Sequence, residues 1–157
     1  MIPKIGITED HLRKTNTLLS IVLSDEMTLY IKTRKFHWNV AGESFMELHK
    51  LFESQYSELE VVIDKVAERI GKLGGKTIGT MREFSLLTRI VEHPNEYPVR
   101  KSMLSELLSD HEIMIAELRK DIDLCTNDYH DAGTADLLTG ILQQHETIAW
   151  VMRRYLG

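Results

Sequence analysis

A chain of 157 residues, 43% of them hydrophobic and 27% charged, can bury the core of one domain, which we expect to span residues 1–157. The formal net charge of −5 argues mildly against a nucleic-acid-binding domain, which normally presents a basic face, and is compatible with acidic cation-binding surfaces. The sequence has no membrane-length apolar run and no N-terminal signal-peptide core, and its single cysteine, Cys125, excludes an intrachain disulfide. These features predict a cytoplasmic protein in which Cys125 is a buried, small apolar residue.

A first helix is predicted from the cap residue Thr8 to about Val40. Two acidic residues follow Thr8, where they suit the positive end of a helix dipole, and apolar residues then recur at helical spacing. Gly42 breaks this pattern before a second helix begins.

The second helix is predicted between Ser44 and Gly75. Ser44 and Glu47 match a capping box, and the tandem Gly74 and Gly75 predict the C-terminal end. Apolar residues three and four positions apart predict the side that packs into a bundle: Phe45, Leu48, Phe52, Tyr56, Leu59, Ile63, Val66, Ile70 and Leu73.

The second half of the chain predicts two more long helices after an unusually long connection, residues 76–98. Its run MREFSLLTRIV could form only a short helix. The third helix is expected to reach about Thr126, and the fourth to begin at the cap residue Thr134; their apolar faces include His111 and His145. Four helices with one long connection between the second and third predict an all-α, ferritin-like four-helix bundle with a short extra helix.

One flank of the second helix carries metal-binding residue types. His49, Glu53, Asp64 and Glu68 lie beside the apolar stripe within a sector of roughly 100°. Each i,i+4 pair can direct two side chains at one ion, but Glu53 and Asp64 are about 16 Å apart along the axis. An antiparallel copy related by a two-fold axis near Leu59 would bring the two pairs together. The spacing therefore suggests a metal site shared by two subunits.

A solvated helix shoulder is the alternative interpretation, because Lys65, Arg69 and Lys72 could neutralise the same carboxylates. His37, between two aromatic residues near the end of the first helix, is by itself more typical of a packed or hydrogen-bonded core residue than of a ligand. No Glu-x-x-His motif occurs, so an intrachain di-iron site of the usual ferritin kind is not expected. Zincin, Cys-x-x-Cys, P-loop and nucleophile-elbow motifs are absent as well.

The run HWNVAGESFMELHKLFE, followed by DKVAERI, LGG and AGTADLLTG, resembles the Dps family of ferritin-like mini-ferritins over nearly the whole chain. The resemblance implies a hollow dodecamer that oxidises ferrous iron, preferentially with hydrogen peroxide, stores ferric mineral and so protects against oxidative stress. It assigns His37, His49 and Glu53 of one chain, with Asp64 and Glu68 of its partner, to the di-iron ferroxidase centre. The family usually has Asp at the position of Glu53. Glutamate keeps the carboxylate but lengthens the side chain by one methylene.

The resemblance also places a three-fold pore at the start of the fourth helix, with Asp136, and less securely Asp131 and Asp128, as pore carboxylates. The alternative for Asp136 is a stabilising first-turn acid. Trp38 is expected to pack against the site, and taking up a stray oxidising equivalent is its alternative role. A DNA-compacting shell is the alternative function, but only Lys4 precedes the first helix, so DNA binding is expected to be weak or absent.

Overall fold

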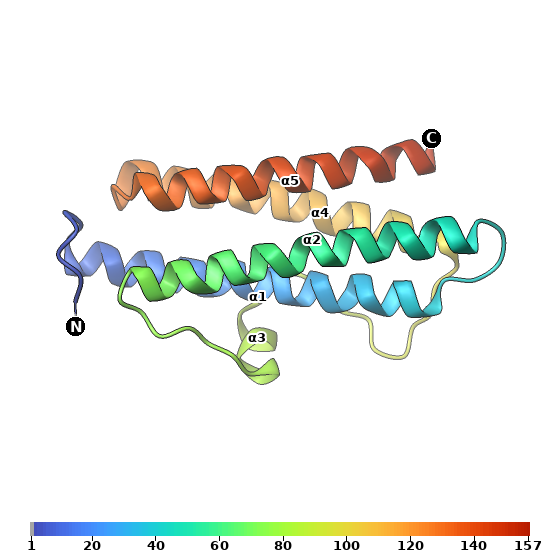
Figure 1. Ribbon diagram of the computed structural model, residues 1–157, viewed down its shortest axis with the longest axis horizontal. Coiled ribbons are helices and arrows are strands. Elements are labelled where there is room, and N and C mark those ends of the chain that lie inside the picture. Colours follow the sequence, from blue (N-terminus) through green and yellow to red (C-terminus); the bar gives the residue numbers. More distant parts are fainter. Residues whose placement is uncertain (1) are drawn as a thin grey trace.

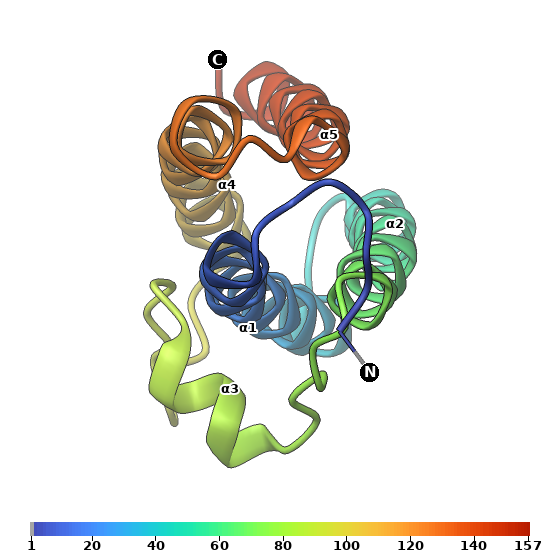
Figure 2. The same ribbon diagram turned by 90° about the vertical axis from the view of Figure 1, so that its left-hand side faces the viewer.

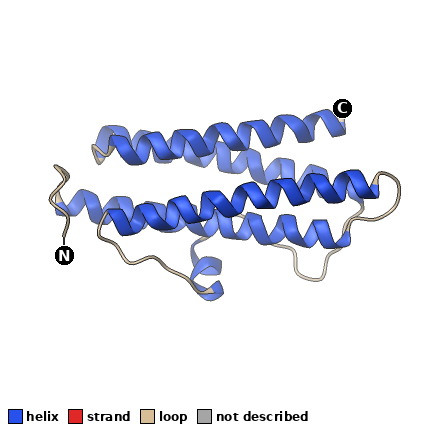
Figure 3. Ribbon diagram, viewed as in Figure 1, coloured by secondary structure: helices blue, strands red, loops and turns tan. Residues whose placement is uncertain are grey.

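The computed structural model describes residues 2–157, which form a bundle of four long helices with a short helix at its side (Figure 1). The long helices are α1 (Glu9–Asn39), α2 (Phe45–Lys72), α4 (Arg100–Asp123) and α5 (Ala132–Leu156). The short helix is α3 (Met81–Leu87), and a π-helical turn, η1 (Leu124–Asp128), extends α4. Residues 2–157 contain only helices and loops, so the predicted all-α bundle is confirmed (Figure 3). Across these residues, no helix is both long and apolar enough to span a membrane.

The bundle consists of two helical hairpins, α1 with α2 and α4 with α5, joined by the long connection that contains α3. The end view shows the four long helices around a common centre, with α3 on the outer side of α1 (Figure 2). The N- and C-terminal ends lie at opposite ends of the bundle (Figure 1). The largest fully buried side chains of the core include Phe36, Phe52, Leu19, Leu59, Leu107 and Met114.

The turn between α1 and α2 differs from the prediction at its second cap. Thr8 caps α1 as expected, and Gly42 adopts a positive φ of 86°, which breaks the helix. Ser44 also lies in the left-handed region, at φ 61°, and its side chain makes no capping hydrogen bond. The predicted capping box is therefore wrong, because a cap side chain reaches the first turn from an extended backbone. The Glu47 carboxylate instead accepts a hydrogen bond of 2.7 Å from the Tyr155 hydroxyl.

The C-terminal end of α2 is closed by its glycines, as predicted. Gly74 has φ 78°, and its N–H donates to the Gly71 carbonyl at 2.9 Å, while the Gly75 N–H donates to the Ile70 carbonyl at 2.9 Å. These two bonds form a Schellman motif. A Cβ at Gly75 would lie 2.7 Å from the Asn16 side chain, so this position also requires close approach to α1. The helix is thus 28 residues long, about 42 Å, which sets the separation of its two ends.

The long connection contains the predicted short helix and is anchored to the bundle by a half-buried cation, Arg89. Thr80 and Glu83 form a capping box at the start of α3. Arg89 then pairs with Asp25 of α1 at 2.7 Å and with Asp121 of α4 at 3.0 Å. Burial raises the pKa of both carboxyl groups, partly offset by the Arg89 charge. This network fixes the connection across α1 and α4.

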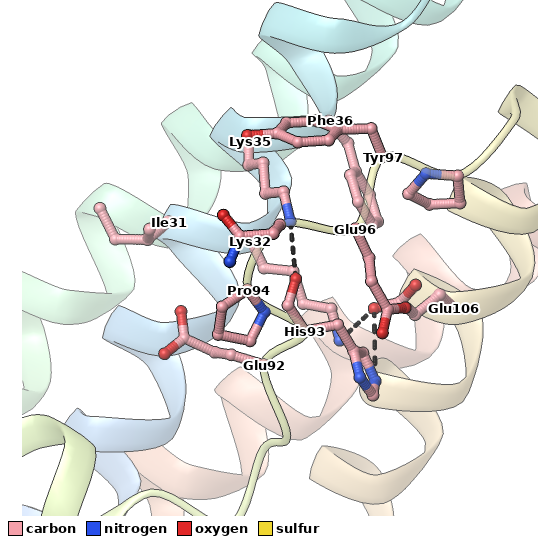
Figure 4. A pocket seen from close by; sticks show the side chains of 12 residues that line it. Ile31, Lys32, Lys35, Phe36, Glu92, His93, Pro94, Glu96, Tyr97 and Glu106 are labelled. Atoms are coloured by element: carbon pink, nitrogen blue, oxygen red, sulfur yellow. Dashed lines mark hydrogen bonds and ion pairs between the residues drawn. The ribbon is translucent and has the colours of Figure 1, made fainter.

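A cavity of about 280 Å³ lies between α1 and the last part of the connection (Figure 4). Lys32 at its wall pairs with Glu106 at 2.7 Å, and the Lys35 ammonium donates to the His93 carbonyl at 2.9 Å. The same ammonium lies 5.0 Å from the centroid of the Tyr97 ring. These contacts hold the connection against α1 at a second point.

The start of α5 corrects another cap prediction. The N-cap is Asp131 and not Thr134; its carboxylate accepts from the Thr134 N–H at 2.9 Å and the Thr134 hydroxyl at 2.6 Å. Arg69 of α2 donates to the same carboxylate at 2.7 Å. An ionised carboxylate can accept all three bonds, which a hydroxyl cannot, so Asp131 outcompetes Thr134 as the cap. Cys125 in η1 is buried, as predicted, and burial raises the pKa of its thiol to about 12.

Candidate metal centre

His37 and His49 lie face to face where α1 ends and α2 begins. Their ring centroids are 3.7 Å apart, with an angle of 20° between the ring planes. The His37 Nδ1 lies 2.8 Å from the His49 carbonyl oxygen, and the His49 Nδ1 lies 2.9 Å from the His37 carbonyl oxygen. The two histidines therefore hold each other through reciprocal bonds across the turn.

These bonds select one tautomer of each ring. A carbonyl oxygen can only accept, so each Nδ1 must carry the hydrogen, and each Nε2 keeps its lone pair in the neutral ring. Metal-binding histidines in proteins are commonly oriented in this way, with the second ring nitrogen donating to a carbonyl or carboxylate. The pair thus presents two oriented Nε2 atoms that are suitable as metal ligands.

Aromatic and cationic side chains support the buried His37. The Tyr56 ring lies edge-on to His37, with centroids 5.2 Å apart and planes at 81°. The Arg34 guanidinium carbon is 4.4 Å from the Tyr56 ring centroid and 5.5 Å from that of Trp38. Trp38 itself is 63% exposed, so within one chain it packs on the site much less than predicted.

The three candidate carboxylates lie exposed along α2. Glu53 is about one turn beyond His49, and Asp64 and Glu68 follow near the other end of the helix. Lys72 pairs with Glu68 at 3.1 Å, with both side chains largely exposed. At that one carboxylate, the solvated-shoulder interpretation describes the single chain correctly, and the pair contributes little to stability.

The two halves of the candidate centre do not meet within one chain. Eleven residues separate Glu53 from Asp64 on an unbroken helix, or about 16 Å along its axis, whereas ligands lie about 2 Å from a metal. Across residues 2–157, no three His, Cys, Asp or Glu side chains lie together in a way that could hold a metal ion. Within one chain, these residues therefore form two separate half-sites.

Large apolar side chains are exposed at the turn that carries the two histidines: Trp38, Phe45 and Met46. The Phe45 ring lies 5.1 Å from that of His49. Exposed apolar side chains that lie together are typical of surfaces that contact other proteins.

The three candidate pore carboxylates differ in exposure. Asp136 in the first turns of α5 and Asp128 in η1 are exposed. Asp131 is 2% exposed, and both of its oxygens are bound within the chain, so it is a structural cap. The structure therefore corrects the assignment of Asp131 to a pore.

A buried polar network lies in the bundle centre, and the sequence patterns did not predict it. Glu26 of α1 accepts from the His145 Nε2 of α5 at 2.8 Å, and the His145 Nδ1 lies 2.7 Å from the His111 Nδ1 of α4. The positions of both histidines on apolar faces predicted their burial, and that prediction is confirmed. Glu26 could have been found only by asking why a glutamate stands within the apolar part of the first helix.

Known proteins resemble this chain over almost its full length. The family model described as Ferritin-like domain matches residues 16–157, which defines the class of protein. A low temperature-induced protein of Nostoc is 40% identical over 97% of this chain and 85% of its own length. The DNA protection during starvation protein 2 of Bacillus anthracis is 36% identical over 89% and 94% of the two chains.

The fold gives the same relationship. A Dps protein from Vibrio cholerae O1, described as a member of a broad superfamily of ferritin-like diiron-carboxylate proteins, matches with a TM-score of 0.92. The two chains are 27% identical, and the match covers 99% of this chain and 97% of the other. The chain belongs to the Dps family of ferritin-like proteins.

Proposed function

We propose that this protein is a ferroxidase and iron-storage mini-ferritin. Ferrous iron is its substrate, and the oxidation takes place at di-iron centres shared by two chains. Each centre uses His37, His49 and Glu53 of one chain with Asp64 and Glu68 of a two-fold-related copy. Hydrogen peroxide is the oxidant, and a hollow dodecamer in the cytoplasm stores the ferric product and so limits oxidative stress.

The observation that carries this proposal is the reciprocal bonding of His37 and His49, which leaves both Nε2 atoms oriented and available. Neutral imidazole and carboxylate ligands suit ferrous iron, and their small number leaves positions open for an oxidant. Fixing the tautomer through a backbone carbonyl means that the ligands are oriented before the iron arrives.

Two features support a centre shared between chains. The helix that carries the ligands holds its two acidic ends about 16 Å apart, so a single chain cannot enclose an ion. The exposed apolar side chains near the histidines would be covered by a second copy. An antiparallel arrangement about a two-fold axis places each half next to the missing one.

Peroxide fits a two-iron centre because its reduction needs two electrons. Each ferrous ion gives one electron, the O–O bond breaks, and two protons are taken up, so that two ferric ions and two water molecules result. Paired delivery avoids a one-electron step that would release hydroxyl radical. Twelve chains of charge −5 would carry −60 in total, which attracts cations, and Asp136 with Asp128 are the proposed pore carboxylates.

A mixing experiment tests the shared centre. Ferrous oxidation is followed with peroxide and with dioxygen in the wild type, in His49→Ala, in Asp64→Ala and in shells reassembled from both variants. Random pairing makes half of the dimers mixed, and each mixed dimer restores one of its two centres, so about one quarter of wild-type activity is expected. An intrachain centre would give no recovery in the mixture.

A matched control removes a carboxylate from the other side of the same helix. Glu58 bonds to Gln144 of α5 at 3.3 Å, and Glu58→Ala should oxidise iron at the wild-type rate. A solution mass equal to one chain would contradict the proposal outright. Because the chain is acidic, we also expect no shift of DNA in a gel at physiological salt.

A further inference from the structure

The buried network at the centre of the bundle connects three helices through one continuous line of polar atoms. Glu26, His145 and His111 have at most 1% of their surface exposed. The line runs from the Glu26 carboxylate through both nitrogens of His145 to the Nδ1 of His111, with contacts of 2.8 and 2.7 Å. It ends at two atoms with no hydrogen-bond partner among residues 2–157, the Glu26 Oε2 and the His111 Nε2.

The contact between the two Nδ1 atoms limits how many protons the network can hold. At 2.7 Å one nitrogen must donate and the other must accept, so a single hydrogen lies between the rings. This holds when both rings are neutral, and also when His145 is cationic and donates to Glu26 and to His111. If both rings were cationic, two N–H groups would point at each other, and the single Glu26 carboxylate would face two charges.

We propose that Glu26, His145 and His111 form an acid-sensitive latch, which joins α1, α4 and α5 at neutral pH and destabilises the bundle when both imidazoles take up a proton. The latch depends only on the folded chain and is independent of the proposed iron chemistry. Its ligand is the proton.

The surroundings of the network offer no other countercharge. The buried residues of α2 include no titratable group. Among the described residues, His145 is the only titratable residue that is buried within α5. The remaining buried charged groups of α1 and α4 already form ion pairs with each other or with Arg89: Asp25, Lys32, Asp110 and Asp121. A second positive charge on the network would thus remain uncompensated in the core.

The direction of the pH effect follows from His111. Burial, and then the charge of His145, hold the pKa of His111 well below its ordinary value near 6.5. Below about pH 6.5, His111 therefore binds a proton in the unfolded chain but not in the folded chain. The free energy of unfolding is unaffected by this group above about pH 6.5 and falls as the pH drops below it. For one such group, the ratio of unfolded to folded chains rises by up to about tenfold per pH unit.

The test compares urea unfolding of the assembled wild type and of His111→Gln between pH 7.5 and 5.0, at one chain concentration. Glutamine can donate to His145 but cannot titrate, and the other groups contribute equally to both proteins. We expect the wild type to lose stability more steeply below pH 6.5, by up to about tenfold in the unfolded ratio per pH unit. The control His93→Gln, at an exposed histidine of the connection, should keep the wild-type slope.

Equal pH slopes in the wild type and His111→Gln would overturn the latch, and so would a flattened slope in His93→Gln. If His111→Gln does not fold, His111→Asn provides the same test, because its side-chain amide takes the place of Nδ1 and cannot titrate. Zinc at pH 7.5 that protects the wild type and His49→Ala, but not His111→Gln, would identify a metal site and would also overturn the latch.

Discussion

Two pairs of histidines in this bundle have opposite arrangements. In the pair of His37 and His49, each Nδ1 donates to a backbone carbonyl, and both Nε2 atoms are left available. In the pair of His111 and His145, the Nδ1 atoms face each other at 2.7 Å. The buried Glu26 carboxylate accepts a hydrogen bond from the His145 Nε2. The partner of Nδ1 therefore decides whether a histidine pair is open to an external ion or satisfied within the core.

Of the variants that distinguish the two histidine pairs, His145→Ala should show the largest effect, a loss of stability. Removing this ring leaves the Glu26 carboxylate buried without its partner, which we expect to lower the free energy of unfolding by about 3–5 kcal/mol. Urea unfolding at pH 7.5 measures it, with the exposed His130→Ala as the control. A loss below about 1 kcal/mol would show that the buried pair is not structural.

The next effect is catalytic, in His49→Ala. Losing a proposed ligand should slow ferrous oxidation by about tenfold or more, while stability changes by only about 1 kcal/mol. Stopped-flow oxidation with peroxide and urea unfolding give the two values. His111→Gln is the matched control and should oxidise iron at the wild-type rate at pH 7.5.

A smaller effect is expected in zinc binding. Zinc accepts the same imidazole and carboxylate ligands, so Asp64→Ala should weaken its binding by about tenfold, measured by calorimetry on the assembled protein. Glu58→Ala should bind zinc as the wild type does. Equal weakening in both variants would mean that zinc responds to the general charge of α2.

The smallest effect is expected in Lys72→Ala. Its pair with Glu68 is exposed, so stability should change by less than about 0.5 kcal/mol. Zinc affinity should be unchanged or tighter, because Glu68 is then free of a competing cation. Weaker zinc binding in this variant would count against Glu68 as a ligand.

The sequence predicted those parts of the molecule that depend on local patterns. The apolar spacing and the glycines at the end of α2 predicted its length, and the separation of Glu53 from Asp64 follows from that length alone. The cap at Ser44 was mispredicted because the left-handed backbone of the turn has no signal in a capping-box pattern. Spacing alone did not link His37 to His49, since their contact depends on how the turn folds back.

Contacts between distant residues were beyond prediction. Glu26 meets His145 from 119 positions away, and Asp131 is withdrawn from solvent by Arg69, which lies 62 positions away. In each case, a residue of a type that is usually exposed is buried because a partner from another helix hydrogen-bonds to its carboxylate. Such pairing follows from the packing of the helices, which no single helix encodes.

The reciprocal bonds of His37 and His49 span only twelve positions of the chain. Contacts between near neighbours in sequence close with little loss of chain entropy, so this hairpin can order early during folding. A newly made chain would then already hold its half of the proposed centre, aligned but incomplete. Under the proposed function, subunit association becomes the event that switches on iron oxidation, and an unassembled chain stays inert.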